Sequence, residues 1–339
     1  MVTLAKVARL ARLATVAALA GLALSPLACG GTLDAGHDVP EGLLPVDRRN
    51  PIILDNDGWS DNWMGEYAAL LANNGGPPLA AIIVNKSAYW TDGVANTSGW
   101  KRLVAAARTS GLKNIPDVIT SSGSPLVRPT DGNVDSTVPN DAMGARQIVE
   151  LSRQLSVPRR PLVVVCGGAL TNVADAYLID HSVVDRVVVV AALGSYAMAN
   201  GVMASPNGEL DPWADWIVTQ RFTYVQVSSF YNQINDVTDA QIPDLPSRPL
   251  GAWIADKVKN IFNVSTASDQ VAVLAVGLPS FVAAVQRATP DTSGDFDPKQ
   301  GPPLKPDPNG NAWVVTHIAA PLAAAQLWQM LLNPQTYGP

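Results

Sequence analysis

The sequence predicts a single domain with an open, doubly wound α/β fold and a mostly parallel sheet. Short runs rich in β-branched residues alternate with longer segments whose apolar residues recur at helical spacing. Two of these runs, at residues 162–165 and 186–191, are dominated by valine, as expected of strands buried on both faces of a parallel sheet. Polar residues or glycines follow several runs directly, where sheets of this class bind their ligands.

The first predicted elements form a βαβ unit. Residues 51–54 predict a strand, residues 61–73 predict a helix with Trp63 and Tyr67 at helical spacing, and residues 79–84 predict a second strand. The further predicted elements are helices at residues 100–110, 141–154 and 319–332 and strands at residues 117–119, 162–165 and 186–191.

Two segments lack such periodicity. Residues 125–140 predict a loop over the carboxyl ends of the strands. Residues 291–311 are rich in aspartate, proline and glycine and predict an exposed hairpin or loop. The aspartates of this second segment do not predict a calcium loop, because the glycine and the closing glutamate of an EF-hand are missing.

The N-terminus predicts an export signal. Lys6, Arg9 and Arg12 precede an apolar run at residues 13–28, which at sixteen residues is short for a membrane span. We therefore expect residues 1–29 to be a signal peptide that takes no part in the fold.

Cys29 leaves two alternatives for the mature chain. Two glycines follow it, and a bacterial lipoprotein is cleaved and lipidated at such a cysteine; the alternative is simple secretion, with Cys29 left in the discarded peptide. Residues 30–49 predict a flexible tether, and residues 50–339 predict the domain, in which Cys166 is the remaining thiol. We expect the chain in the bacterial cell envelope, periplasmic or lipid-anchored, or secreted, with a lipid anchor as its one contact with a membrane.

The composition is that of a globular protein with a small substrate. Of the 339 residues 47% are hydrophobic and 15% are charged, which is enough apolar surface for a core and too little charge for a disordered chain. The net charge of −6 argues against a nucleic-acid partner, because few cations are present to neutralise phosphates.

Acidic residues gather after the first predicted strand. Asp55, Asp57 and Asp61 fall within seven residues, and no lysine or arginine lies between Arg49 and Lys86. Carboxylates this close raise each other's pKa unless a positive charge offsets their repulsion. Oxygen ligands without histidine or cysteine suit Ca²⁺ or Mg²⁺ better than zinc or copper. The alternative is a solvated turn, with Asp61 or a neighbouring serine as a helix cap.

Four segments resemble motifs of the inosine-uridine nucleoside hydrolase family, and they occur in that family's order. They are the acidic segment DNDGWSDNWMGEYAALL at residues 55–71, VVVCGGALTNVA at 163–174, ELDPWAD at 209–215 and SDQVAV at 268–273. The resemblance covers roughly residues 50–335. It implies the same α/β fold and hydrolysis of the N-glycosidic bond of ribonucleosides by an activated water.

The resemblance also implies a calcium site. Asp57 would bind Ca²⁺ and take a proton from the attacking water, with Asp55 close behind it, either as a direct ligand or as a residue that contacts a ligand. Asp269 and the backbone carbonyl of Gly167 would be further ligands. Asn62 stands where the family has a ligating aspartate, which should weaken the site because a charge and a second oxygen are lost.

A second set of residues would hold the ribose. By the same resemblance this set is Asp61, Asn85, Glu209 and Asp211, with Asn200 or Asn207 as an additional contact from the loop before them. Asp211 replaces an asparagine of the family motif, so an acceptor-only carboxylate stands in place of an amide. The alternative for each of these residues is a surface or capping role.

The leaving group is where the sequence departs most from the family. Ser268 stands where many members have a histidine, and His37, His181 and His317 lie at positions that do not predict a catalytic role. Two functions from different classes therefore remain: a calcium-dependent nucleoside hydrolase, or a non-catalytic envelope protein that binds a nucleoside or sugar. The base of the substrate and the oligomeric state, for which a homo-oligomer is compatible, stay open.

Overall fold

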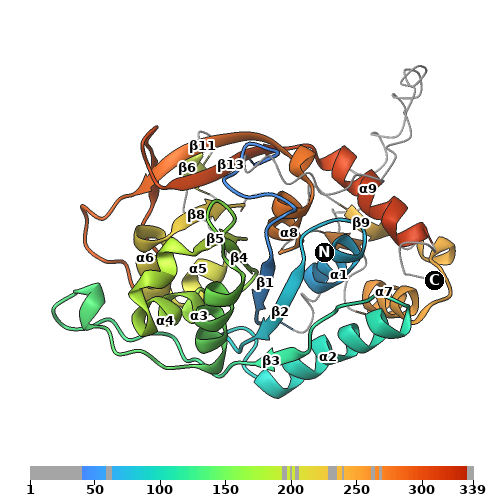
Figure 1. Cartoon of the computed structure of the whole chain (residues 1–339), viewed down its shortest axis with the longest axis horizontal. Helices are drawn as coiled ribbons and strands as arrows, with labels where there is room; N and C mark the ends of the chain where they lie inside the picture. The colour runs from blue at the N-terminus through green and yellow to red at the C-terminus, as the bar shows by residue number, and fades with distance from the viewer. Residues whose placement is uncertain are drawn as a thin grey trace, which may run out of the picture. The chain divides into compact units, whose positions relative to one another are not determined.

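A central sheet with helices on both faces forms the core of the computed structural model (Figure 1). The structure describes residues 40–58, 63–192, 197–198, 201–202, 206–227, 235–238, 240–260, 264–266 and 269–333. Within these residues the sheet has nine strands in the order β12-β11-β13-β8-β5-β4-β1-β2-β3. Their bounds, in chain order, are β1 Ile52–Asn56, β2 Leu79–Val84, β3 Val118–Thr120, β4 Leu162–Cys166, β5 Val187–Ala191, β8 Thr223–Gln226, β11 Val282–Pro290, β12 Leu304–Pro306 and β13 Ala312–Ile318.

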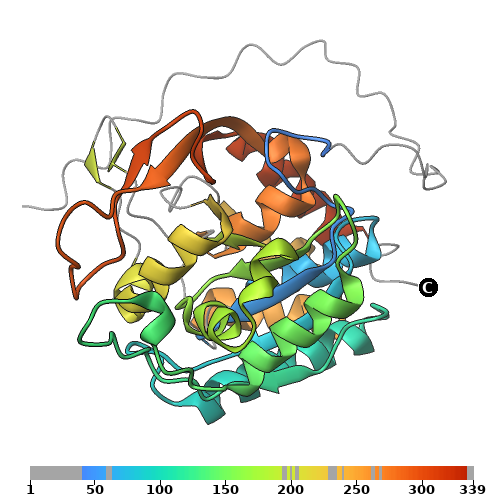
Figure 2. The ribbon, with the colours of Figure 1, turned by 60° about the vertical axis from the view of Figure 1, so that its left-hand side comes forward.

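The sheet is mostly parallel. Seven strands, from β3 through β13, pair in parallel, and the edge strands β11 and β12 extend them antiparallel. Figure 2 shows this orange and red extension beside the parallel part. The predicted fold class, an open doubly wound α/β sheet in one domain, is confirmed. The predicted hairpin in residues 291–311 corresponds to β12 and the loops around it.

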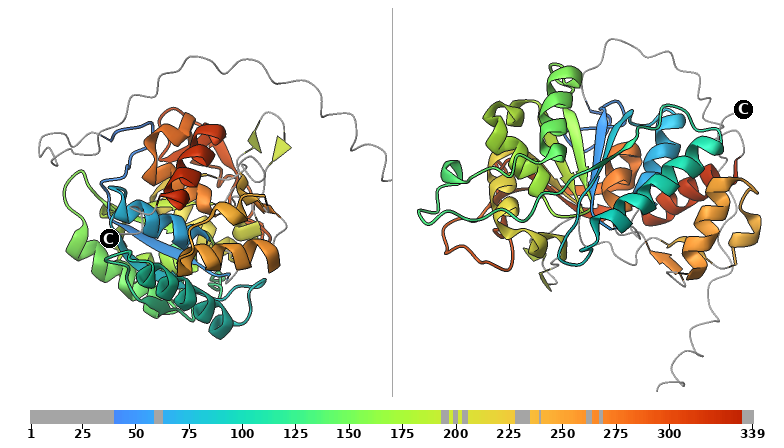
Figure 3. Two further views of the ribbon diagram at one scale, coloured as in Figure 1. Left: turned by 90° about the vertical axis from the view of Figure 1, so that its right-hand side faces the viewer. Right: turned by 90° about the horizontal axis from the view of Figure 1, so that it is seen from below.

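Helices cover the two faces of the sheet, as the view from below shows (Figure 3). One core contains residues from α1 (Trp63–Asn73), α2 (Gly93–Thr109), α7 (Pro249–Asn260), α8 (Gln270–Gly277) and α9 (Ala320–Leu332). The other core contains residues from α3 (Met143–Leu155), α4 (Thr171–Ile179) and α6 (Pro212–Arg221).

Strand residues alternate between these two cores. Ile52 and Leu54 of β1 belong to one core, and Ile53 between them belongs to the other. Because side chains of a strand point to opposite faces in turn, a strand covered on both faces needs apolar residues at every position. The valine runs of β4 and β5 meet the same requirement.

The remaining described elements are short. They are α5 (Pro206–Leu210), the pair β6 (Ala197–Met198) and β7 (Gly201–Val202), the pair β9 (Asn235–Thr238) and β10 (Val264–Thr266), and 3₁₀ turns at Val134–Ser136, His181–Asp185, Ile242–Asp244 and Pro279–Phe281. Among the helices of the described residues, none combines the length and the apolar character that crossing a membrane requires.

Most predicted elements are found within a few residues of their expected bounds, and α2 differs most. The helix predicted at residues 100–110 begins at Gly93, because the Asp92 side chain accepts hydrogen bonds from the amides of Val94 and Ala95, each at 3.0 Å. The first two turns contain Asn96, Thr97 and Gly99, and these residues hide the start of the helix from a search for apolar spacing.

Residues 125–140 contact α4 and the start of α6. Tyr177 of α4 donates a hydrogen bond to Asp135 at 2.9 Å, and Trp213 of α6 donates one to Thr137 at 3.0 Å. The middle of this segment therefore packs on α4 and α6, and the amide of Leu126 near its start donates to the side chain of Asp211 at 2.9 Å. The expected place of the segment over the carboxyl ends of the strands stays a prediction.

Part of the predicted tether is folded. Residues 30–39 lie outside the described residues, but Leu44 and Val46 are buried in the core, and the side chain of Asp47 accepts from the amide of Glu41 at 2.9 Å. Residues 40–49 therefore pack against the domain.

Candidate active site

The carboxyl ends of three adjacent strands bring the predicted residues together. Asp55 is the penultimate residue of β1, and Asp57 follows that strand. Asn85 follows β2, and Gly167 follows β4. Backbone hydrogen bonds fix the turns to one another: the amide of Asn85 donates to Asn56, and the amide of Gly167 donates to Asp55, both at 2.9 Å. Residues 30 to 112 positions apart in the sequence thus meet at one edge of the sheet.

Asp269 reaches the same edge from a different element. It precedes α8, a helix that packs against β4 and β5, and its side chain accepts a hydrogen bond from Nδ2 of Asn56 at 3.2 Å. Asp269 is 4% exposed. Its predicted position beside the acidic segment after β1 therefore agrees with the structure.

Two glycines allow this close approach. A Cβ atom at Gly167 would lie 2.7 Å from Cβ of Asp269, and one at Gly168 would lie 3.0 Å from Oδ1 of Asp57. Side chains at these positions would push both carboxylates away from the turn after β4.

The carboxylate of Asp55 is held by a short chain of hydrogen bonds. Nδ2 of Asn172 donates to Oδ1 of Asp55 at 2.9 Å, and the Ser121 hydroxyl donates to Oδ1 of Asn172 at 2.8 Å. Oδ2 of Asp55 is buried and has no hydrogen-bond partner among the described residues. Burial, with a smaller contribution from the charge of Asp57, raises the pKa of Asp55 to about 7, although the Asn172 hydrogen bond lowers it.

Asp57 is in a similar environment. Its Oδ1 accepts from the amide of Gly58 at 2.8 Å, and its buried Oδ2 has no hydrogen-bond partner among the described residues. Burial raises the pKa of this carboxyl in spite of the nearby Ser87 hydroxyl and the Gly58 amide, which lower it. In the described part of the chain no lysine or arginine forms an ion pair with Asp55 or Asp57.

These atoms have the chemistry of a hard-cation site. One carboxylate oxygen each of Asp55 and Asp57 is buried without a hydrogen-bond partner among the described residues, and Gly167 and Asp269 lie on turns that contact this segment. Carboxylate and carbonyl oxygens are ligand types that calcium prefers. No three histidine, cysteine, aspartate or glutamate side chains of the described residues converge closely enough to form a metal site by themselves. The donor types fit a cation. Two further predicted residues, Asp61 and Asn62, lie outside the described residues, so the structure shows only part of the predicted ligand set.

Asn85 offers a donor next to these acids. Its Oδ1 accepts from the amide of Lys86 at 3.0 Å, whereas its buried Nδ2 has no hydrogen-bond partner among the described residues. Helix α2 fixes both neighbouring turns, because Asn96 donates to the Asn85 carbonyl at 3.2 Å and Trp100 donates to the Gly58 carbonyl at 2.9 Å. A hollow of about 490 Å³ opens nearby, lined by Lys86 and by residues 91–94 and 120–122.

Asp211 has a different environment from the one we expected for a ribose ligand. It caps α6 by accepting from the amide of Ala214 at 3.0 Å, and it also accepts from the amide of Leu126 at 2.9 Å and the hydroxyl of Thr171 at 2.7 Å. Burial raises its pKa to about 6, against these hydrogen bonds. This is the geometry of the capping alternative, and the ribose-binding role stays a prediction. Glu209 is exposed on α5, and Asn200 lies outside the described residues.

Comparisons with solved structures relate this architecture to known proteins. A plant nucleoside hydrolase matches with a TM-score of 0.57 at 16% identity, over 84% of this chain and 99% of that chain. An inosine-guanosine nucleoside hydrolase matches with a TM-score of 0.60 at 17% identity, over 83% and 98%. The inosine-uridine preferring nucleoside hydrolase of Bacillus anthracis matches with a TM-score of 0.59 at 12% identity, over 84% and 99%. The chain has the nucleoside hydrolase fold. No family model and no curated sequence matches it significantly.

Within the nucleoside hydrolase fold, three asparagines contact the candidate site, and two of them, Asn56 and Asn172, were not predicted from the sequence. Asn56 contacts Asp269, Asn172 contacts Asp55, and Nδ2 of Asn207 lies 2.9 Å from the Gly167 carbonyl. Asn56 and Asn172 stand inside the recognised motifs, so their positions were a usable signal. Asn207, which was considered for the ribose, contacts the turn after β4, and its role toward a ribose stays a prediction.

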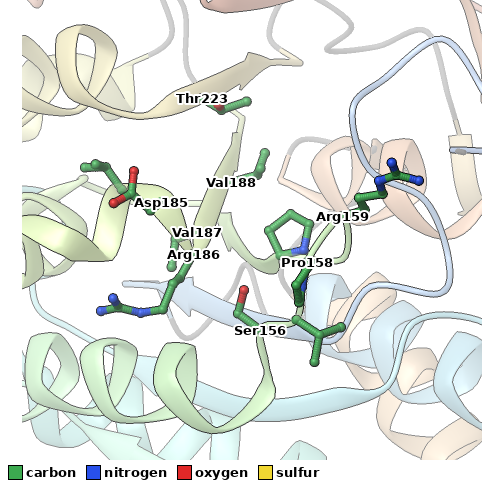
Figure 4. Close-up of a pocket in the computed structure, with 11 residues that line it drawn as sticks. Ser156, Pro158, Arg159, Asp185, Arg186, Val187, Val188 and Thr223 are labelled. Atoms are coloured by element: carbon green, nitrogen blue, oxygen red, sulfur yellow. The ribbon is translucent and has the colours of Figure 1, made fainter. Parts of the chain in front are cut away.

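A cavity of about 430 Å³ lies at the amino ends of the strands, at the end of the sheet opposite to the candidate site (Figure 4). Its lining comes from the residues that precede β4, from residues 184–188 at the start of β5 and from Thr223 at the start of β8. Arg186 in its wall is neutralised by Asp180 at 2.8 Å and also donates to Ser152 and Ser182. None of the predicted site residues lines this cavity.

The described histidines are remote from the candidate chemistry. His181 stacks on Tyr177 with ring centroids 4.5 Å apart, at the end of α4. His317 is exposed on β13 beside Thr316. His37 and Ser268 lie outside the described residues.

Proposed function

We propose that this protein hydrolyses the N-glycosidic bond of ribonucleosides in a calcium-dependent reaction and releases ribose and the free base. The observation that carries the proposal is that one buried oxygen each of Asp55 and Asp57 has no hydrogen-bond partner among the described residues, at the end of the sheet where Gly167 and Asp269 also lie. Such oxygens are expensive to bury unless a ligand pairs with them in the working state. The nucleoside hydrolase fold of the chain supports the same reaction.

Asp57 would act as the general base. Its carboxylate would bind the predicted ion and accept a proton from the water that the ion activates. Asp55, Asp269, Asn62 and the Gly167 carbonyl would hold the ion. When bound, calcium would neutralise these carboxylates and lower the pKa of the attacking water.

The ribose would be held by groups around this base. Asn85 presents a donor in its Nδ2, which suits a sugar hydroxyl oxygen. Asp61, Glu209, Asp211 and Asn200 complete the proposed set. Hydrogen bonds to the hydroxyls orient C1′ above the water, so that they contribute through positioning.

We further propose that the leaving base is cleaved with little acid catalysis. No histidine in the described part of the chain contacts the candidate site, and an acid of this kind is typically worth about 10² to 10⁴-fold in rate. A substrate with a good leaving group, such as p-nitrophenyl riboside, should then react much faster than inosine or uridine.

We also propose that the protein works in the bacterial cell envelope or outside it. The basic residues and the apolar run at residues 13–28 support export, and Cys29 supports a lipid anchor as its form.

Ribose release from a panel of nucleosides tests the function. Purified protein is incubated with inosine, guanosine, uridine, cytidine and p-nitrophenyl riboside, with EDTA or with added Ca²⁺. We expect ribose release with calcium, loss of the activity in EDTA and recovery when calcium returns. No release from any substrate, in protein shown to be folded and loaded with calcium, would refute the enzyme.

A second candidate function is binding of a nucleoside or sugar without catalysis. The observation in its favour is Asp211, whose two oxygens are already used inside the protein. Nucleoside binding measured by calorimetry, together with no ribose release over many hours, would support this candidate over the enzyme.

A further inference from the structure

Asn207 occupies an unusual position in the candidate site. Its Nδ2 lies 2.9 Å from the carbonyl oxygen of Gly167, 3.1 Å from that of Ala192 and 3.4 Å from Oδ1 of Asp269. These oxygens come from the end of β4, the end of β5 and the residue before α8. One nitrogen therefore joins three parts of the chain that are distant in sequence.

The three oxygens around Nδ2 of Asn207 form an arrangement that favours a positively charged group at the centre. The amide nitrogen of asparagine carries two hydrogens and no net charge, so it satisfies such oxygens only partly. Two of the three, on Gly167 and Asp269, are among the proposed calcium ligands. In this conformation the Asn207 amide therefore makes the contacts that a cation would make.

The distances also suit a different role for the same side chain. Two oxygens that are each about 2.4 Å from one calcium ion and subtend about 75 to 90° lie about 2.9 to 3.4 Å apart. These separations match the ones between Nδ2 of Asn207 and its neighbours on Gly167 and Asp269. Rotation of the amide by about 180° exchanges its nitrogen and oxygen and would place Oδ1 where a ligand oxygen belongs.

We propose that Asn207 is a calcium ligand that reverses its amide with the state of the site. Without the ion, Nδ2 donates to Gly167, Ala192 and Asp269; with the ion, Oδ1 ligates it beside the oxygens of Gly167 and Asp269. The inference rests on the calcium site of the proposed function and adds to it a neutral oxygen ligand.

Calcium titration of the full protein and of its variants tests this assignment. Asn207→Asp supplies a charged oxygen and should bind Ca²⁺ at least tenfold more tightly than the wild type, whereas Asn207→Ala should bind it at least tenfold more weakly. In EDTA both variants should unfold at a lower temperature than the wild type, because the oxygens of Gly167 and Asp269 lose their donor. Asn309→Asp and Asn309→Ala, on an exposed turn, are the matched controls and should change neither quantity.

The outcomes separate the inference from the function on which it rests. Equal or tighter calcium binding by Asn207→Ala, with wild-type binding intact, would overturn the ligand assignment and leave the proposed enzyme standing. Weaker binding by Asn207→Asp would overturn it as well, and this variant decides the matter if Asn207→Ala does not fold. A wild type that binds no calcium in the same titration would refute the metal site itself, and the inference with it.

Discussion

At the scale of single residues, function and stability make opposite demands on Asp57. A buried carboxylate with a partnerless oxygen destabilises the folded chain when no cation is present, because the charge has lost its water. The same carboxylate is the proposed base. A variant that removes the charge but keeps the shape should therefore improve stability and abolish activity.

Asp57→Asn is the residue-scale prediction. Nucleoside hydrolysis should fall by about 10³-fold, since the general base is lost. In EDTA the free energy of unfolding should rise by about 1 kcal/mol, because an amide replaces an unpaired buried carboxylate. Ribose release and urea denaturation measure the two effects, and Asp117→Asn, on an exposed residue, serves as the control. A fall in stability together with unchanged activity would exclude this role for Asp57.

At the scale of elements, the start of α3 depends on α4. The Asp175 side chain accepts from the amides of Asn140, Asp141 and Ala142, at 2.8, 3.2 and 2.8 Å, which are donors ahead of the first turn of α3. A carboxylate with several amide donors is a strong form of helix capping. The sequence analysis placed α3 correctly but could not find this cap, because its partner lies about 33 residues further along the chain.

Asp175→Ala should therefore lower the free energy of unfolding by about 2 kcal/mol. Asp185→Ala, on an exposed residue of a 3₁₀ turn, should change it by less than about 0.5 kcal/mol. Chemical denaturation monitored by tryptophan fluorescence measures both values. Similar effects of the two substitutions would show that the Asp175 contacts contribute little.

The packing of α6 predicts a dependence on pH. Asp215 is buried against Gly301, and burial, together with the charge of Asp211, raises its pKa to about 7. A carboxyl whose pKa is higher in the folded state than in the unfolded state stabilises the fold at low pH. This contribution is lost as the pH rises from about 4 to about 7.

Asp215→Asn should remove this dependence. At pH 8 the variant should be more stable than the wild type by about 2 kcal/mol, and near pH 4 the difference should vanish. Urea denaturation at both pH values measures it, with Asp295→Asn on the exposed loop as the control. A difference that is the same at both pH values would mean that Asp215 is not the titrating group.

At the scale of the whole molecule, the sequence predicted the features that local patterns and motifs encode. The valine runs and the polar residues after them were sufficient to predict the parallel sheet and the acidic residues at the carboxyl ends of its strands. Contacts between distant positions were not predictable, such as Asn207 with Asp269, 62 residues later, or Asp211 with Leu126, 85 residues earlier. Asparagine and aspartate are equally common in surface loops, so the residue types alone do not identify their partners in the folded chain.

The segment at residues 40–49 is a whole-molecule example of the same limit. Its prolines and glycine predicted a tether, yet Leu44 is 5% exposed and Val46 is 2% exposed, both within one of the two cores. At the end of the segment, Oδ1 of Asn50 accepts from the amide of Asp47 at 2.9 Å, and its Nδ2 donates to the carbonyl of Pro161, next to β4, at 2.8 Å. The segment therefore closes part of the core and is not a free linker.

Truncation tests this role. A chain that begins at residue 50 loses two buried apolar side chains, worth about 4 kcal/mol, and its Tm should be lower by about 10 °C than that of a chain that begins at residue 40. The chain that begins at residue 40 should unfold at the same temperature as one that begins at residue 30. Calorimetry of the three chains in the same buffer gives the comparison. Equal Tm values for the chains that begin at residues 40 and 50 would support the interpretation of residues 40–49 as a tether. The domain would then begin at Asn50.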